Sequence, residues 1–584
     1  MNNKKNYDIL KKSFDVSSDS VVNLKARVNI DNKKKSDFSD KQDKDTQEFK
    51  TEASMIKNLE NTTKNISKRN ISKDDNNSAN VKSNYFLRYF FYFLVFFLPL
   101  FFLPFSMEIF EFNKTLLLFV VSSLAFLVWM VKMIIIDRRI VFVKTPLDVP
   151  IIIFIFLVLL STVLSVDKVS SVLGFYGRFS DSLMVYLSLA MLYFVGVNSV
   201  VFRQVQDDNQ QICDDSKNFT NNLIKTFLAS SFVVIIVSLL YSLGIKLIPL
   251  NETQFNSFNL VSGSFNILGI YLVSVIIIAF YYLLENKNAL VKCLVYLLIT
   301  MSLILLAIID FVVAWVVLAV SLLLALILSF IVRRHGENAV SARHCLVPAG
   351  LIILISFAFI ATSLTCMNNN IESNFKSSSM SSSIKDRIAP SVDNGQIEDG
   401  KRFIKEVILD KETAIYITVE GIKEDPIIGI VGTGPGTYLY NFSKFKPVEF
   451  NNNIYWNIRF DKAGSEIIEK ISTIGILGVL SYLLIMVLVV GMFLKALRKV
   501  RNNNFIYLFS AWFSLLLFQF LYIESMTTKF VFWMLTIILV VKCYSFRTQD
   551  AEENILWEFK IRRSNCIFYL SLLLVIIASI TISY

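Results

Sequence analysis

The chain has 584 residues, of which 54% are hydrophobic and only 18% are charged. A soluble chain of this length would carry about 25% charged residues and would divide among several cores. Histidine is nearly absent, with only His335 and His344, which argues against a histidine triad or a multi-histidine metal site. The formal net charge of +11 is typical of cytoplasmic loops that collect Lys and Arg, so we expect no nucleic acid partner.

Residues 1–84 form a polar N-terminal segment that is rich in Asn, Lys, Ser and Asp. Such a segment cannot bury enough apolar surface to offset the entropy of ordering it. Its start lacks the basic, apolar and small-residue succession of a cleavable signal peptide. We therefore predict a disordered, cytoplasmic tail.

Most of the remaining chain consists of apolar runs of about 20 residues, each sufficient to span a hydrocarbon core of about 30 Å. The runs lie near residues 86–105, 115–136, 149–166, 183–202, 223–246, 264–285, 289–309, 311–332, 346–365, 474–494, 505–523, 530–545 and 566–583. The sequence therefore predicts an all-α integral membrane protein with about 12–13 transmembrane helices, helices 1–9 within residues 85–365 and helices 10–13 within residues 474–584. Short breaks at Asn286–Asn288 and Asp310 separate neighbouring runs.

The connectors between these runs alternate in charge. Lys and Arg gather in every second connector, as at Arg138, Arg203, Arg333, Lys495 and Arg547. The intervening connectors are poor in positive charge: Glu108–Lys114, Asp167–Asp181, Asn251–Ser262 and Glu524–Lys529. Because cationic connectors stay in the cytoplasm, the alternation predicts a cytoplasmic N-terminus.

The same topology places a long segment, residues 366–473, on the outer face. It is too long to be a simple connector, and Phe403–Leu409 and Ile415–Ile422 are candidate amphipathic helices within it. Only Cys366 of the six cysteines falls on the outer side, so no disulfide is expected there. The cysteine spacings fit no zinc site, and we expect neither a metal nor a cofactor.

The predicted helices carry few ionisable residues near their centres. Ion-coupled transporters and proton pumps generally need such residues at the bilayer midplane. Asp310 is the nearest exception, and its position indicates a tight outer turn between two helices. Gly and Pro do not interrupt paired helices at matching positions, as they often do in inverted-repeat transporters. Chemistry is therefore expected where the outer loops meet the membrane surface.

Several segments together resemble the O-antigen ligase and polymerase superfamily of bacterial membrane glycosyltransferases. In chain order the segments are Lys144–Pro150, Leu164–Asp167, Leu173–Leu183, Gly263–Gly269, Gly421–Gly429, Gly432–Tyr438, Phe460–Glu466 and Ile474–Tyr482. Their order and their placement around one long outer loop carry the resemblance, which covers most of the membrane region and none of the tail.

The resemblance implies a fold like that of GT-C-type membrane glycosyltransferases in the bacterial cytoplasmic membrane. It also implies ligation or polymerisation of a glycan carried on a polyprenyl diphosphate, at the outer face, with a lipid, glycan or protein as acceptor. Besides membrane lipids, no other partner is implied. Charge accumulates on the leaving diphosphate, which fixed cations stabilise, and the acceptor hydroxyl benefits from a general base.

The chain departs from the family pattern at two positions. Gly464 stands where the family has a favoured catalytic histidine, and Val312 stands where an arginine is often found. Two alternatives to a divergent transferase stay open. One is a catalytically inactive scaffold for envelope assembly that has the same fold, and the other is a flippase for lipid-linked glycans.

Arg178 and Glu466 are the two candidate catalytic residues. Arg178 either binds the diphosphate or extends to the lipid headgroups. Glu466 either replaces the missing histidine as the base or caps the following helix. The candidate substrate-binding residues are Arg459, Lys462, Arg387, Asn266, Gly434 and Gly436. Asn266 either bonds the substrate or caps its helix, and the Gly432–Gly436 cluster either cradles a phosphate or forms a turn.

Overall fold

The computed structural model describes residues 86–104, 106, 108–137, 139–206, 209–243, 245, 259–333, 350, 352–353, 356, 406–452, 455–499, 504–547 and 556–560. The predicted tail lies outside the described residues, as do the first part of the outer loop and the predicted helix at 566–583. Only a few positions of the predicted helix at 346–365 are described.

Eight helices in this part of the chain are long and apolar enough to cross a membrane. They are α3 (Glu111–Val131), α7 (Asn209–Ser242), α9 (Phe265–Glu285), α10 (Ala289–Ile309), α11 (Val312–Arg333), α16 (Glu466–Lys499), α17 (Asn504–Leu521) and α18 (Met526–Arg547). Shorter apolar helices cover Phe86–Phe97, α4 (Asp148–Val163) and the first part of α6 (Leu183–Gln206). Each coincides with a predicted run, which confirms an all-helical, multi-pass membrane protein.

Two of the helix breaks fall where the sequence predicts them. α9 ends at Glu285 and α10 begins at Ala289, and the Asn286 side chain donates to the Tyr282 carbonyl at 2.9 Å. Between α10 and α11, Asp310 adopts a left-handed conformation with φ of +51°. A left-handed residue ends a helix abruptly, so the chain reverses within two residues.

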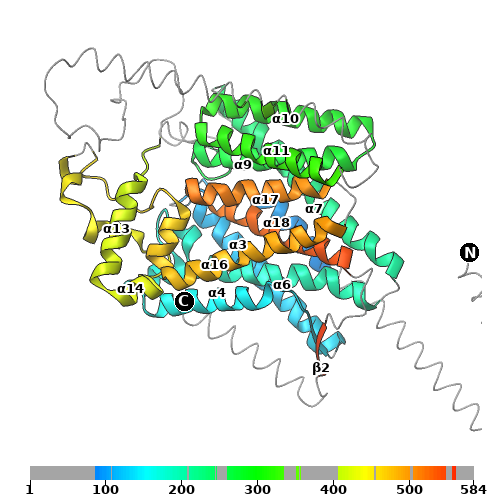
Figure 1. Ribbon diagram of the computed structural model, residues 1–584, viewed down its shortest axis with the longest axis horizontal. Coiled ribbons are helices and arrows are strands. Elements are labelled where there is room, and N and C mark those ends of the chain that lie inside the picture. Colours follow the sequence, from blue (N-terminus) through cyan, green and yellow to red (C-terminus); the bar gives the residue numbers. More distant parts are fainter. Residues whose placement is uncertain are drawn as a thin grey trace, which may run out of the picture. The chain divides into compact units, whose positions relative to one another are not determined.

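Helix α9 packs against α10, α11 and α17 (Figure 1). Every residue from Ile267 to Leu283 is buried, and nearly all are apolar or aromatic. The hydroxyl of Ser274 donates to the Tyr271 carbonyl at 2.7 Å, which satisfies it within the helix. The middle of α9 is therefore an apolar packing element.

The other membrane helices form a second group, in which α16 packs along α4, α3 along α6, and α18 against α6 and α16. At one end of α3 a π-helical turn (Lys132–Asp137) leads into strand β1 (Arg139–Val143). This strand pairs antiparallel with β2 (Leu556–Lys560), with Arg139 opposite Lys560. The pair joins two connectors that the charge alternation assigns to the same side.

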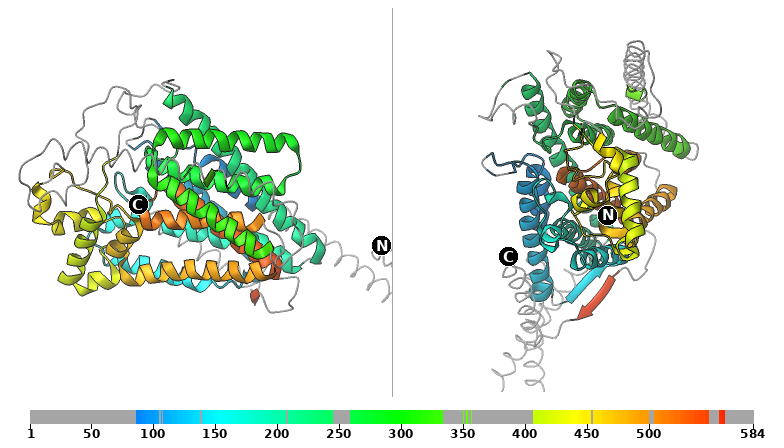
Figure 2. Two further views of the ribbon diagram at one scale, coloured as in Figure 1. Left: turned by 45° about the horizontal axis from the view of Figure 1, so that its top comes forward. Right: turned by 90° about the vertical axis from the view of Figure 1, so that its left-hand side faces the viewer.

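The described part of the outer loop contains α13 (Lys411–Glu424), α14 (Pro426–Val431), α15 (Tyr438–Phe445) and a 3₁₀ turn, η5 (Val448–Asn452). Figures 1 and 2 show α13 lying across one end of the bundle rather than along it. The predicted helix at Ile415–Ile422 is confirmed within α13. The one at Phe403–Leu409 is wrong at the described positions 406–409, because Asp410 is extended and caps α13 by accepting from the Thr413 N–H.

These loop elements enclose a small apolar cluster of their own. Leu409 and Ile417 pack there with Tyr438, Phe442 and Phe460. The rings of Phe442 and Phe460 meet edge to face with centroids 5.6 Å apart. The loop is therefore a packed structure that can hold side chains at fixed positions.

Helix α16 begins at Glu466, earlier than the predicted run, and is interrupted at Gly475, where φ is +78°. A Cβ atom on Gly475 would lie 2.3 Å from the Ile430 carbonyl oxygen, and one on Gly432 would lie 2.2 Å from that of Thr473. The two backbones cross here without side chains, which fixes α14 against the start of the membrane-spanning part of α16.

Candidate functional site

The four cation-poor connectors converge at one end of the bundle, where they meet the returning end of the outer loop. Lys114, at the start of α3, donates to the Leu260 and Val261 carbonyls at 2.5 and 2.6 Å and to the Thr527 hydroxyl at 3.1 Å. The Met526 N–H in turn donates to Glu111 at 3.2 Å. The structure therefore places these connectors together at one end, as the charge alternation requires.

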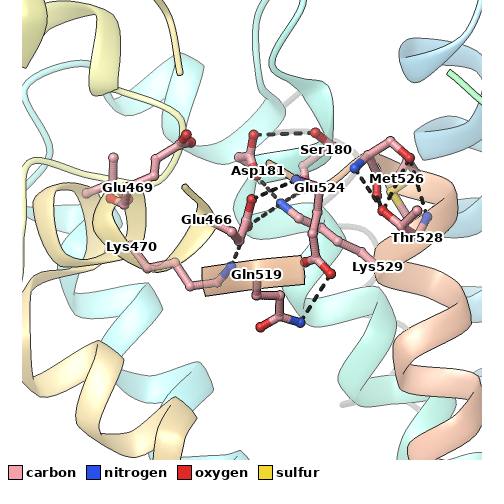
Figure 3. A network of polar contacts seen from close by, with 12 residues as sticks. Ser180, Asp181, Glu466, Glu469, Lys470, Gln519, Glu524, Met526, Thr528 and Lys529 are labelled. Carbon is pink, nitrogen blue, oxygen red and sulfur yellow. Dashed lines mark hydrogen bonds and ion pairs between the residues drawn. The ribbon is translucent and has the colours of Figure 1, made fainter. Parts of the chain in front are cut away.

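A buried ion-pair network lies at the centre of this convergence (Figure 3). The Lys529 ammonium of α18 pairs with Asp181 and, at 2.9 Å, with Glu466. Glu466 also pairs with Lys470, one turn along α16. Asp181 belongs to a 3₁₀ turn, η3 (Phe179–Asp181), that follows the short helix α5 (Lys168–Leu173). Three segments far apart in sequence, η3, α16 and α18, therefore share one set of charges.

Arg178 extends this network towards Glu469. Its guanidinium pairs with Glu469 and, at 3.1 Å, with Asp181. The residue is only 1% exposed, so its side chain does not extend to the lipid headgroups, and its role in binding a diphosphate stays a prediction. The helical turn of η3 directs Arg178 inward, and two carboxylates neutralise it. Arg178 is thus a buried member of the network.

Glu466 does not cap α16, and its role as the base stays a prediction. One carboxylate oxygen faces Lys470 and Lys529, and the other accepts from the Glu524 N–H at 3.3 Å. Its own N–H donates to the Tyr522 carbonyl at 3.1 Å. Both oxygens are therefore engaged, and Glu466 joins α16 to the segment between α17 and α18.

The network is electrically balanced, because three cations (Arg178, Lys470 and Lys529) face three carboxylates (Asp181, Glu466 and Glu469). Burial would raise the pKa of Asp181, but Arg178 and Lys529 outweigh it and hold this pKa below its ordinary value. A further carboxyl, that of Glu524, has its pKa raised to about 8 by burial and by Glu466. Glu524 is therefore mostly protonated at neutral pH.

We expect Glu524→Gln to stabilise the protein at alkaline pH. Because the folded-state pKa of about 8 lies above the ordinary 4.5, the folded protein binds a proton that the unfolded chain releases, and stability falls as pH rises between these values. The variant lacks this loss, and its amide oxygen can still accept from Gln519, which donates to Glu524 at 3.1 Å. The melting temperature, measured across pH, should be higher for the variant than for the wild type beyond about pH 8 and equal for the two near pH 4.5. Melting temperatures that depend on pH in the same way for both proteins would contradict the raised pKa of Glu524.

Lys462 and Glu108 lie beside the network and are only partly buried. Lys462 forms no ion pair with any residue in the described part of the chain, yet it acts electrostatically on Glu108, Asp181 and Glu406. Glu108 accepts a long hydrogen bond of 3.4 Å from the Gly177 N–H. Burial and the neighbouring Glu111 raise the pKa of Glu108 to about 7. The pair thus combines an available ammonium with a carboxyl that titrates near neutrality.

Asn266 does not cap its helix, and its predicted role in binding substrate stays a prediction. The cap of α9 is Ser264, whose hydroxyl accepts from the Ile267 N–H at 3.2 Å. Asn266 instead donates to the Tyr522 hydroxyl at 2.7 Å, which donates to the Glu406 carboxylate at 3.1 Å. Burial raises the pKa of Glu406. This chain of bonds fixes the loop to the start of α9, next to Lys462.

The glycines of the loop form turns with positive φ, namely Gly432, Gly434, Gly436 and Gly464. The Gly434 N–H donates to the Thr473 carbonyl at 2.8 Å, so it is not available to a phosphate. A Cβ atom on Gly434 would lie 2.1 Å from the Ser165 hydroxyl. Gly434 is therefore a packing turn, and Gly436 follows it in the same turn.

The backbone at Gly464, where the sequence analysis noted a missing histidine, leaves no room for a side chain. Its φ is +67°, and a Cβ atom there would lie 2.2 Å from the Leu409 carbonyl oxygen. A Cβ atom would clash with the backbone at this position, so the local backbone conformation requires glycine here. Of the remaining candidates, Arg459 is exposed, and Arg387 lies outside the described residues.

Sequence reasoning missed Asp181, Glu469, Lys470 and Lys529 as site residues. Asp181 and Lys529 end two of the cation-poor connectors, and Glu469 and Lys470 follow Glu466 by one helical turn. The sequence did contain a signal for them: both cations and carboxylates lie next to apolar helices in connectors that are predicted to share one side. Among the described residues, no group of three or more His, Cys, Asp or Glu side chains is arranged to hold a metal ion.

Fold and site together define a polytopic, all-helical membrane protein with a buried, balanced charge network at one end of its bundle. No protein-family model and no curated protein matches this chain.

Proposed function

We propose that the protein transfers a glycan from a polyprenyl diphosphate to an acceptor hydroxyl at the outer face of the bacterial cytoplasmic membrane. In this reaction the acceptor oxygen bonds to the anomeric carbon. The bond from that carbon to the diphosphate breaks, and its electron pair leaves with the phosphate oxygen. The hydroxyl proton passes to a base. The reaction therefore needs a cation beside the leaving group and a proton acceptor near it.

One observation carries the proposal: Lys462 acts electrostatically both on Glu108 and on Asp181 of the buried ion-pair network, where the loop meets the membrane helices. Lys462 would face the diphosphate, and Glu108 would accept the proton. A base with a pKa of about 7 suits catalysis near neutral pH, because it is both deprotonated and basic enough. The buried network, Arg178 and Glu466 included, would hold the two in place.

The packing of α9 supports an enzyme over a flippase. A flippase for lipid-linked glycans needs a polar path through the bundle, whereas the described residues of α9 from Ile267 to Leu283 are buried and almost wholly apolar. The scaffold alternative remains an outcome of the experiment. The polymerase and ligase forms of the reaction use the same site and differ in the acceptor.

The test is a transfer assay with purified protein in liposomes that contain total lipid-linked glycan extracted from the producing cells. We expect wild-type protein to release polyprenyl diphosphate and to lengthen or relocate the glycan. Glu108→Gln should lower the rate by about 10²-fold or more and abolish its rise with pH through about 7, since a general base contributes about 10²–10⁴-fold. Lys462→Met should lower it by about 10²-fold, as when one stabilising donor is removed.

Glu424→Gln and Lys444→Met are the matched controls, because these two residues form an exposed ion pair of 2.8 Å elsewhere in the loop. Both should leave the rate unchanged. Wild-type protein that moves the glycan across the bilayer without releasing diphosphate would be a transporter, and protein that does neither would be a scaffold. An active Glu108→Gln variant would contradict only the residue assignment.

A further inference from the structure

The lipid-facing surface of α4 continues past the end of the helix. α4 has 16 residues, which at about 1.5 Å each cover about 24 Å, less than a hydrocarbon core of about 30 Å. Its exposed apolar side chains run from Val149 to Val163. The next exposed ones are Leu164, Val166 and Val169, which are 54%, 62% and 68% accessible. The surface that must meet hydrocarbon therefore extends into the segment after α4.

Helix α14 is fixed beside that segment. The Val166 N–H donates to the Thr433 carbonyl at 3.1 Å, immediately after α14, and the Ser161 hydroxyl donates to the Thr473 carbonyl at 2.9 Å. The close crossing at Gly432 and Gly475 ties α14 to α16 as well. From Gly475 to Lys499, α16 is long enough to cross a core of about 30 Å at about 1.5 Å per residue. The crossing therefore lies at one end of the membrane-spanning part of α16.

One face of α14 is apolar and uncovered by the described residues. Gly429 packs on Ile422 of α13, whereas Ile427 and Ile430, on the other face, are 63% and 49% exposed. Nearby, the half-exposed Tyr440 donates its hydroxyl to Asp167 at 2.8 Å. Tyrosines with an apolar ring and a bonded hydroxyl are enriched where membrane meets water.

We propose that α14, with Val166 and Val169, is embedded in the outer leaflet as a short interfacial shelf, whose occupant is lipid acyl chain. Continuity decides the occupant: the exposed face of α14 adjoins the lipid-facing sides of α4 and of α16, where Ile476 and Leu480 are exposed. A protein partner on α14 alone would have to displace lipid from both neighbours. The inference rests on the membrane architecture and not on the proposed transfer reaction.

Site-directed spin labelling tests the shelf directly. The six cysteines are replaced, and single cysteines at Ile427, Ile430, Glu424 or Lys444 carry the label in liposomes of phosphatidylethanolamine and phosphatidylglycerol. At Ile427 and Ile430 we expect collisions with oxygen to exceed those with a water-soluble nickel chelate, because oxygen concentrates in hydrocarbon. The labels at Glu424 and Lys444, both exposed and charged, should show the reverse order.

Two outcomes would overturn the shelf. Labels at Ile427 and Ile430 that collide with the nickel chelate as often as the label at Glu424 would place α14 in water. Labels that neither reagent reaches, at a protein-to-lipid ratio low enough to separate copies, would mean that protein covers this face. Only variants that elute as a single species with wild-type helicity are compared.

Discussion

Lys529→Met is expected to destabilise the protein by about 3–5 kcal/mol, the usual effect of breaking a buried ion pair. Lys529 is shared by Asp181 and Glu466, and all three residues are almost fully buried. Methionine fills similar space but leaves the network with three carboxylates and two cations. The free energy of unfolding in mixed micelles, measured with denaturant, provides the value.

A second variant separates charge imbalance from lost packing. Lys529→Met with Asp181→Asn leaves two intact pairs, Arg178 with Glu469 and Lys470 with Glu466. We expect the double variant to be more stable than Lys529→Met, with a coupling energy of about 0.5–3 kcal/mol. Lys423→Met is the matched control, since Lys423 is exposed and pairs only at the surface with Glu420; it should not change stability. Additive single and double effects would contradict a balanced network.

Gly464→His should lower both the stability of the protein and the proposed transfer activity. The left-handed φ of +67° costs a non-glycine residue about 1–2 kcal/mol. The new Cβ atom would also meet the Leu409 carbonyl at 2.2 Å, and overpacking of this kind costs about 1–3 kcal/mol more. The strain falls between Lys462 and Glu466, so it would disturb the proposed site directly. Unfolding and transfer assays on the same preparation measure both effects.

Gly491→Ala is the control for Gly464→His. Gly491 lies in α16, and a Cβ atom there meets nothing within 4 Å, so the variant should fold and function as the wild type does. Gly464→Ala should already show most of the stability loss, because the clash comes from the Cβ atom. A stable and more active Gly464→His variant would mean that this backbone relaxes easily and that the position is catalytic.

The helices could be predicted because their signal is local. The apolar composition of each run predicts that the run is buried in lipid or protein. The polar residues at Asn286 and Asp310 interrupt the apolar sequence at the positions where the helices end. Alternating charge in the connectors likewise predicted which of them share one end. For α16 the prediction began at residue 474, because the polar first turns, from Glu466, carry charges that only the network buries.

By itself, then, the sequence determined the helical membrane architecture and which connectors lie at the same end of it. Only the tertiary structure decided which side chains meet. Lys529 and Asp181 are 348 residues apart, and their pairing depends on the register of helices that apolar periodicity does not specify. The same holds for Arg178, which looks exposed in a short connector but is buried once η3 turns it towards Glu469. Which charged side chains pair in such a network depends on ångström-scale packing between distant segments. Whether a segment is buried in a membrane depends on the composition of that segment itself.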